Sequence, residues 1–219
     1  MNRRDFTPEV MSILLLLGII ILVVVRHGRM PGIWIEYPVN FDTAFIVLYI
    51  LWLLAETPIA EKDVNTEGKR TLDFATCQIY GFGQALTFLS ALWFPSVWHA
   101  PNMAHFIGIS LFLVGVYFRL WAIKTLGVFY SHRVRTLTQH RIVDSGPYHL
   151  IRHPAYTGMM IAHAGVVLYF LNRVTLFVFL IGFVPAIILR IVIEERTLVR
   201  IAGYSDFAKK RKRLFPGIW

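Results

Sequence analysis

Residues 174–189 read VTLFVFLIGFVPAIIL, a run without any charged side chain that ends at Arg190. A helix that crosses a lipid bilayer needs about 20 mostly apolar residues, and this run with its flanks reaches that length. Because lipid cannot satisfy open backbone groups, a helix is the structure expected for such a segment. Pro185 removes one backbone donor within the run and therefore predicts a kink.

Five further stretches share this apolar character. They comprise residues 11–25, 43–55, 74–94, 106–118 and 156–171. Several of them reach the length of a span only with their polar flanks, which favours tilted helices. Because only Asn172 and Arg173 separate the last two stretches, we expect a tight helical hairpin near the C-terminus. The sequence thus predicts an all-α fold: a polytopic integral membrane helical bundle of about six spans.

The composition agrees with a membrane protein. Of the 219 residues, 56% are hydrophobic and 16% are charged, whereas a soluble domain has about 45–50% apolar and about 25% charged residues. The net charge of +9 would suggest nucleic acid in a soluble protein, but in a membrane protein it reflects basic loops near anionic lipid. No usual nucleic-acid motif occurs, so we expect no nucleic-acid partner. A single cysteine, Cys77, excludes an internal disulfide framework.

The distribution of Lys and Arg between the spans predicts an orientation. If the N-terminus lies inside, nearly all basic residues of the connecting segments fall on the inner side, and only Arg26, Arg29 and Arg173 fall on the outer side. The positive-inside rule then places both termini in the cytoplasm. We expect two regions along the chain: residues 1–123 as an N-terminal region of four spans, and residues 124–219 as a core that carries the chemistry.

The polar connection over residues 124–155 is the longest between two spans. It exceeds the usual loop length, which marks it as a candidate functional element. It holds four histidines and several arginines but no cysteine and few carboxylates, a poor donor set for zinc, and we expect no metal. A basic loop lying on anionic headgroups would explain its charge as well.

Ionisable residues near the end of the last span form a second cluster. Arg190 and Glu194 are four residues apart and share one helix face, whereas Glu195 points about 100° away. Such groups are costly in a span and often face a functional cavity, although a stabilising ion pair or snorkelling to the interface is an alternative. For Arg119 we expect snorkelling at the inner interface, and for His163 a hydrogen-bonded packing role.

Three motifs in the C-terminal half resemble a known family. Residues 140–148 read HRIVDSGPY, residues 152–158 read RHPAYTG and residues 190–198 read RIVIEERTL. This order is similar to the isoprenylcysteine carboxyl methyltransferase family, which has H-x-L-V-x-x-G-x-Y, then R-H-P-x-Y-x-G, then R-I-x-x-E-E-x-x-L. The resemblance covers roughly residues 126–219, including the FPGIW end of the chain, and the first four spans carry no diagnostic residue.

The resemblance implies S-adenosylmethionine as cofactor and a pocket on the cytoplasmic side, roofed by the 124–155 loop and the tail. It implies Arg190 and Glu194 as the catalytic residues, with Arg190 facing the methyl acceptor. The residues implied to contact the cofactor are His140, Arg141, Ile142, Val143, Tyr148, His153, Pro154, Ala155, Tyr156 and Glu194. At position 135 this chain has Arg where the family has a glutamine that contacts the cofactor.

The expected activity is methyl transfer to a lipidic or membrane-associated acceptor, above all a carboxylate of the prenylcysteine type. A carboxylate needs no general base, and an arginine can orient it by a bidentate pair. A thiol or a phospholipid amine would need a base, for which Glu194 or a loop histidine would serve. A second alternative is an NADPH-dependent membrane reductase, since sterol reductases resemble this layout. Those enzymes tend to have R-H-x-N-Y, and residues 154–156, Pro-Ala-Tyr, favour the methyltransferase. A third is a non-enzymatic protein that retained the fold.

Overall fold

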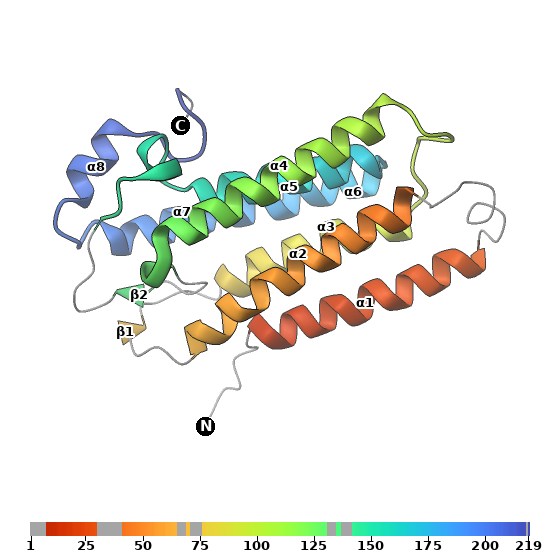
Figure 1. The fold of residues 1–219 in the computed structure, drawn as a ribbon, viewed down its shortest axis with the longest axis horizontal. Coiled ribbons are helices and arrows are strands. Elements are labelled where there is room, and N and C mark those ends of the chain that lie inside the picture. Colours follow the sequence, from red (N-terminus) through yellow and green to blue (C-terminus); the bar gives the residue numbers. More distant parts are fainter. Residues whose placement is uncertain are drawn as a thin grey trace.

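The chain folds as an antiparallel bundle of long helices (Figure 1). The computed structural model describes residues 8–29, 41–64, 69–70, 76–130, 135–136, 142–217 and 219, with side chains from residue 13 to 25, 41 to 56, 76 to 130, 142 to 217 and at 219. The long elements are α1 (Pro8–Arg29), α2 (Phe41–Val64), α3 (Thr76–Trp93), α4 (Met103–Leu126), α5 (Pro154–Tyr169) and the uninterrupted series α6 (Arg173–Phe177), η3 (Val178–Phe183) and α7 (Val184–Leu198).

The apolar stretches 11–25, 43–55 and 106–118 lie within α1, α2 and α4. Helices α3 and α5 cover most of 74–94 and 156–171, and the series from α6 to α7 contains 174–189, so the helical prediction is confirmed. Two helical segments of the described chain, Met103–Phe129 and Arg173–Leu198, are long and apolar enough to cross a membrane, and a shorter apolar helix covers Ile13–Val25. The predicted hairpin is present between α5 and α6. Asn172 begins α6 as its N-cap, and its side chain accepts a hydrogen bond of 2.8 Å from the backbone N–H of Thr175.

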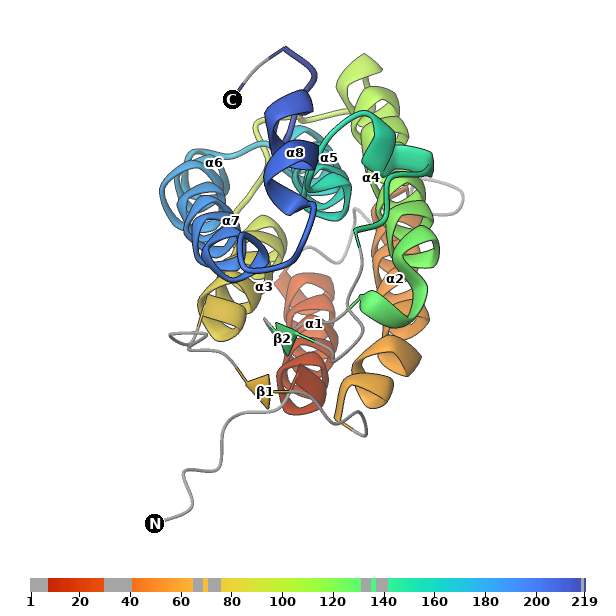
Figure 2. The same ribbon diagram turned by 90° about the vertical axis from the view of Figure 1, so that its left-hand side faces the viewer.

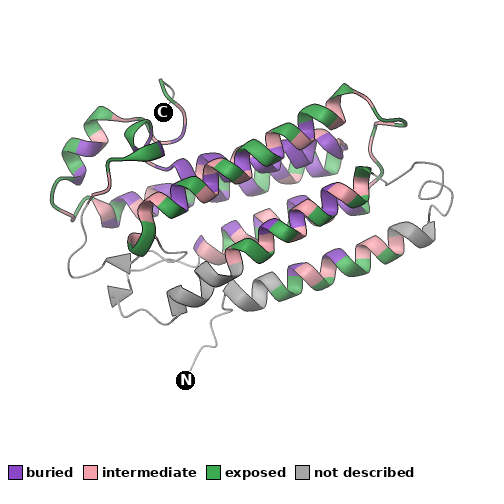
Figure 3. Cartoon of the chain, viewed as in Figure 1, coloured by how far each residue is buried: buried purple, intermediate pink, exposed green. Residues whose placement is uncertain are grey.

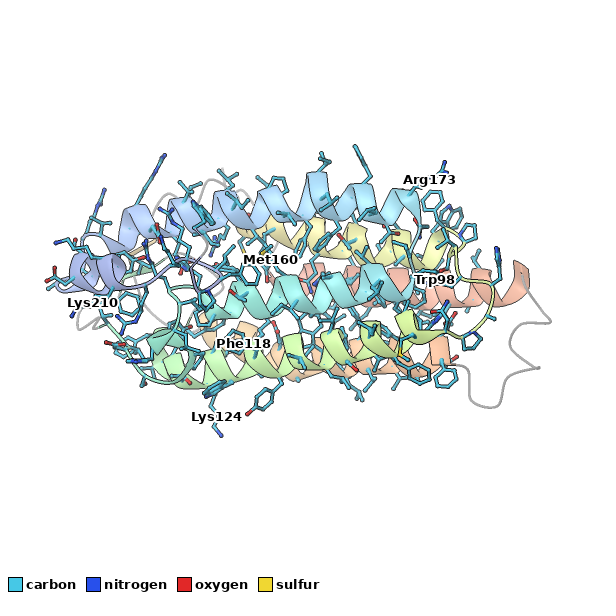
Figure 4. All side chains as sticks on the ribbon, turned by 90° about the horizontal axis from the view of Figure 1, so that it is seen from above. Trp98, Phe118, Lys124, Met160, Arg173 and Lys210 are labelled. Carbon is cyan, nitrogen blue, oxygen red and sulfur yellow. The ribbon has the colours of Figure 1, made fainter. Side chains whose placement is uncertain are left out.

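The short elements gather at one end of the bundle, which we call the loop end (Figure 2). They are η1 (Gly127–Phe129), η2 (Gly146–His149), α8 (Tyr204–Lys210) and an antiparallel pair of two-residue strands, β1 (Lys69–Arg70) and β2 (Arg135–Thr136). The strand pair is a departure from the all-α prediction, and it joins the 124–155 connection to the segment before α3. Lys124 and Lys210 lie at the loop end, whereas Trp98 and Arg173 lie at the opposite end (Figure 4).

Local signals set the ends of α4. Asn102 and His105 form a capping box at its start, where the Asn102 side chain accepts from the N–H of Ala104 at 2.9 Å. Gly127 ends it with a φ of 57°, a left-handed value that costs a glycine little. Both signals fit a helix that runs from the opposite end to the loop end, where the 124–155 connection begins.

A π-helix lies just before Pro185, where the sequence predicts a kink. The π-helix η3 ends at Phe183, two residues before the proline. The N–H of Val184 donates to the carbonyl of Phe179, five residues back. A proline removes one hydrogen bond of the helical ladder, and a π-type turn is a common way for the ladder to absorb the change. The helix therefore continues through the proline and delivers Arg190 and Glu194 to the loop end.

Glycines allow α4 and α5 to make the closest helix contact of the bundle. A Cβ on Gly158 would lie 2.6 Å from the backbone nitrogen of Arg119, and one on Gly165 would lie 2.5 Å from the carbonyl of Gly108. Gly115 meets the backbone of Ala162 equally closely. Small residues at such positions let helix backbones approach in membrane bundles. The glycine of the RHPAYTG motif, Gly158, thus serves helix packing.

The outward-facing residues of the helices are exposed (Figure 3), and many of them are large and apolar. On α4 alone they include Met103, Phe106, Val114 and Tyr117. Inside, Tyr49 stacks on Phe88, and its hydroxyl lies 3.3 Å from His163 Nε2. His163 Nδ1 lies 3.0 Å from the carbonyl of Met159, which confirms the packing role expected for this histidine. Apolar area of this extent on the outside is unusual for a soluble monomer and fits contact with lipid.

Candidate active site

The centre of the candidate site is the hydroxyl of Tyr156, in the first turn of α5. It donates a hydrogen bond of 2.8 Å to Glu194 Oε2 and accepts one of 3.1 Å from Arg190 Nε. Arg190 also donates through Nη1 to Thr76 Oγ1 on α3, at 2.8 Å. Arg190 and Glu194 therefore do share one face of α7, as their spacing predicts, and the tyrosine of the RHPAYTG motif joins them. The arginine is 2% exposed, so its charge is held inside the bundle.

The adjacent Glu195 has a different set of hydrogen-bond partners. Its Oε1 accepts from Arg152 Nη1 at 2.8 Å and lies 3.2 Å from His153 Nε2, and its Oε2 accepts from Arg213 Nε at 2.8 Å. The hydroxyl of Tyr204 also donates to it, at 3.3 Å. One carboxylate thus gathers side chains from the segment before α5, from α8 and from the C-terminal tail. The two neighbouring glutamates point to different sides of α7, as the helical repeat requires.

Backbone hydrogen bonds join the C-terminal tail to the start of α5. The N–H groups of Arg152 and His153 donate to the carbonyls of Lys212 and Arg213, both at 2.9 Å. The hydroxyl of Thr157 donates to the carbonyl of Leu214 at 2.7 Å. The predicted convergence of the long connection and the tail is thus present in the described chain. The tail anchors the segment that carries the RHPAYTG motif.

A small apolar cluster lies beside these polar groups. Its buried members are Ala122, Ile123, Tyr148, Ala155, Tyr204 and Phe207, and Ile142 packs against it. Burial, and then the negative charge of Glu194, raise the pKa of the Tyr148 phenol above its usual range. Tyr148 therefore stays protonated as a hydrogen-bond donor over the ordinary pH range. The cluster brings Ile142, Tyr148 and Ala155, three residues implied for cofactor contact, into one neighbourhood.

The remaining residues implied for cofactor contact fall into two groups. His140 and Arg141 lie outside the described residues. His153, Pro154 and Val143 are described: His153 binds Glu195, its ring 5.9 Å from that of Tyr156, and Pro154 is the first residue of α5. Val143 is partly buried. Of the residues implied by the motifs, the structure therefore joins Arg190, Glu194 and Tyr156 by direct hydrogen bonds.

Arg119 corrects one prediction. We expected it to snorkel to the interface, but it is 1% exposed and pairs with Glu56 of α2. Its Nε and Nη2 donate to the two carboxylate oxygens of Glu56 at 2.5 and 2.7 Å. Partners of opposite charge in a bundle interior cost less than a buried charge alone. The separation of 63 positions between the two residues is why sequence patterns did not reveal the pair.

Comparisons with known proteins agree with this geometry. Residues 107–200 match the model of the isoprenylcysteine carboxyl methyltransferase (ICMT) family. The chain is 31% identical to protein-S-isoprenylcysteine O-methyltransferase of Saccharomyces cerevisiae over 115 residues, which cover 51% of this chain and 48% of the yeast protein. It is 29% identical to the probable protein-S-isoprenylcysteine O-methyltransferase of Oryza sativa subsp. indica, covering 48% of this chain and 57% of the rice protein. The aligned region thus spans about half the length of these curated relatives.

A solved structure supports the fold over the whole chain. The eukaryotic intramembrane Ras methyltransferase ICMT superimposes with a TM-score of 0.58 and 17% sequence identity, covering 100% of this chain and 79% of that one. At this identity the match concerns the fold alone. Residues 107–200, which match the family model, include Tyr156, Arg190 and Glu194, the three residues that hydrogen bonds join in the structure. The comparisons confirm the expected resemblance to the isoprenylcysteine carboxyl methyltransferase family, whose model matches residues 107–200.

Proposed function

We propose that this protein is a multi-pass integral membrane methyltransferase that uses S-adenosylmethionine and methylates a lipidic carboxylate of the prenylcysteine type. The observation that carries the proposal is the hydroxyl of Tyr156, which bridges Arg190 and Glu194. Those residues come from two separate family motifs and meet at one point in the fold. The names of the yeast and rice relatives, both isoprenylcysteine O-methyltransferases, support the same acceptor.

The donor set at this point fits the proposed cofactor. S-adenosylmethionine carries a sulfonium, an ammonium group, a carboxylate and an adenine, and when bound it supplies an electrophilic methyl group. Glu194 offers a carboxylate to the cationic groups. Tyr148 and the apolar cluster around it offer aromatic and apolar surface to a ring. His140 and Arg141 stay predicted contacts, because they lie outside the described residues.

Arg190 is placed to orient the acceptor. Its Nη1 is tied to Thr76 of α3 and its Nε to Tyr156 of α5, so the guanidinium is fixed between three helices. A fixed guanidinium can position a carboxylate oxygen in line with the methyl group, and holding the reactants in contact supplies much of the rate. A carboxylate is already nucleophilic, so this chain needs no residue that removes a proton.

We infer that the loop end faces the cytoplasm and that the bundle crosses the membrane six times. The exposed side chains at that end include Lys124, Lys209, Lys210 and Lys212, and the opposite end carries Arg173. This asymmetry supports the orientation. The exposed apolar faces of the helices support the lipid contact. In this arrangement the cofactor enters from the cytoplasm. Residues 124–219 supply most of the site, and residues 1–123 form a region of four spans.

Calorimetric binding to the purified full chain in detergent tests the cofactor. We expect micromolar binding of S-adenosylhomocysteine, and at least a tenfold weaker binding for Glu194→Gln because this variant loses the negative charge proposed to face the ammonium group of the ligand (about 1.4 kcal/mol for a factor of ten). Asp206→Asn is the matched control, since Asp206 is exposed and pairs with Lys209 on the surface of α8. Binding of NADPH without S-adenosylhomocysteine would overturn the proposal in favour of a reductase.

Transfer of a labelled methyl group identifies the acceptor. The probes are an S-prenylcysteine with a free carboxylate, its methyl ester, a phosphatidylethanolamine and a small thiol. Labelling of the free carboxylate but not of the ester supports the proposed acceptor. Labelling of the amine or the thiol instead would keep the cofactor and contradict the carboxylate.

A further inference from the structure

A buried ion pair outside the matched motifs reaches the candidate site. Glu56 of α2 and Arg119 of α4 form a bidentate pair, with both contacts between 2.5 and 2.7 Å. Side chains of the pair are 15% and 1% exposed. Trp52, one turn before Glu56, donates to the same carboxylate at 2.6 Å. The carboxylate is therefore held by its own helix while it holds the arginine.

The arginine has two further contacts, and both lie at the loop end. Its Nη2 donates to the hydroxyl of Tyr130 at 3.2 Å, and its Nη1 donates to the carbonyl of Ala155 at 3.4 Å. Ala155 lies in the first turn of α5, and both Ala155 and Tyr156 belong to the RHPAYTG motif. Glu56, outside residues 107–200, is thereby connected through one side chain to the motif segment.

Backbone packing places the arginine against the same turn. A Cβ on Gly158 would lie 2.6 Å from the nitrogen of Arg119 and 2.8 Å from its Cβ, so α5 lies directly on α4 here. Arg119 thus touches α5 at Gly158 through its backbone and at Ala155 through its guanidinium, on adjacent turns. Tyr156 follows Ala155 directly, and its hydroxyl holds Arg190 and Glu194. A shift of the Ala155 carbonyl would move that hydroxyl as well.

A charged pair inside a helical bundle is costly, and apolar residues of similar volume would often stabilise the fold equally well. The presence of the pair is therefore weak evidence for a stabilising role. We propose that the Glu56–Arg119 pair is a positioning device: it holds the Ala155 carbonyl, and with it Tyr156, in the place that the site requires. This inference rests on the proposed function, but the placement itself can be measured without it.

The decisive variant replaces both partners by apolar residues, Glu56→Leu with Arg119→Met. Because no unpaired charge remains, we expect its melting temperature to stay within a few degrees of the wild type or to rise. We expect the Kd for S-adenosylhomocysteine to rise about tenfold, the effect of losing one hydrogen bond from a charged group. Each single substitution leaves a buried charge alone and should lower the melting temperature. Tyr169→Phe, which removes a hydrogen bond to Asp42 at the opposite end of the bundle, is the control and should bind as the wild type does.

Hydrogen exchange separates positioning from general stability and does not require a ligand. In the double variant we expect faster exchange of the amides at residues 155–158, with the middle of α3 unchanged. Unchanged exchange at 155–158 together with wild-type binding would overturn the proposal and leave the pair a structural one. Uniformly faster exchange in all helices would overturn it too. If the wild type binds no S-adenosylhomocysteine, the proposed function fails while the exchange result still decides the placement.

If the double variant does not fold, Arg119→Lys takes its place. A lysine keeps the charge opposite Glu56, but a single ammonium group cannot reach Glu56 and the Ala155 carbonyl in the fork geometry of a guanidinium. We expect a retained melting temperature with faster exchange at residues 155–158. A lysine variant with wild-type exchange and binding would contradict the proposal.

Discussion

Tyr156 is the residue on which the candidate site depends most directly. Its hydroxyl accepts from Arg190 and donates to Glu194, and both neighbours carry charge. Tyr156→Phe removes only the oxygen. Because a hydrogen bond to a charged group contributes about 1.5–3 kcal/mol, we expect methyl transfer to fall about 10- to 100-fold in kcat/KM. Initial rates with an S-prenylcysteine acceptor measure the effect.

A second tyrosine supplies the control for this substitution. The hydroxyl of Tyr169 donates to Asp42 at 3.0 Å, at the opposite end of the bundle. Tyr169→Phe therefore removes the same chemical group from a tyrosine–carboxylate contact far from the loop end, and it should leave kcat/KM within about threefold of the wild type. Equal losses in the two variants would mean that Tyr156 acts through stability alone.

At the residue scale, sequence reasoning reached the groups whose spacing is local. Arg190 and Glu194 are one helical turn apart, so the shared face followed from the helical repeat alone. The pairing of Arg119 with Glu56 could not follow in this way, because 63 positions separate the two residues and no local pattern specifies which helices pack together. The same holds for Arg213, which reaches Glu195 only after the tail has folded back on α5.

At the scale of elements, the contact between α4 and α5 depends on glycine. A Cβ on Gly115 would collide with the backbone of Ala162, and backbone cannot move aside as a flexible side chain can. We expect Gly115→Ala to destabilise the bundle by about 1–3 kcal/mol or more through overpacking. Because α5 carries Tyr156, the binding of S-adenosylhomocysteine should weaken as well. The melting temperature in detergent and the Kd measure both effects.

Gly182→Ala is the matched control for Gly115→Ala within the same helical bundle. Nothing lies within 4 Å of a Cβ built on it, although it too lies in a helical segment, η3. Gly182→Ala should be neutral or stabilise by up to about 1 kcal/mol, since alanine loses less conformational freedom in a helix. A Gly115→Ala variant as stable as Gly182→Ala would show that α4 and α5 do not meet as described.

The long helices were predictable from sequence because they are long apolar runs, and some of their ends carry recognisable signals. Asn172 before α6 and Gly127 after α4 are such signals. The strand pair β1–β2 was not predictable, because two residues on each side carry no periodic pattern. The sequence predicts a kink at Pro185 but not the π-helix η3, since a proline removes a bond without specifying how the ladder responds.

At the scale of the whole molecule, charge and apolar surface are separated. The apolar outer faces run along the helices, and most basic side chains of the described chain lie at the loop end, on α8 and on the tail. The proposed orientation puts the basic end on the cytoplasmic side, because translocating many Lys and Arg residues is unfavourable. The position of the candidate site at the loop end then decides from which side a water-soluble cofactor enters.

Single cysteines test this orientation directly. In a Cys77→Ala background, Ser205→Cys places a thiol on exposed α8 and Ala100→Cys places one in the exposed segment between α3 and α4, at the opposite end. In each substitution the cysteine side chain is close in size to the one that it replaces. In intact cells expressing the protein, we expect a membrane-impermeant maleimide to label Ala100→Cys, and to label Ser205→Cys only after the membrane is opened. Labelling of both in detergent controls for access. The reverse pattern would place the loop end and the candidate site outside the cytoplasm, and labelling of both thiols in intact cells would mean that the bundle does not cross the membrane as a sealed unit.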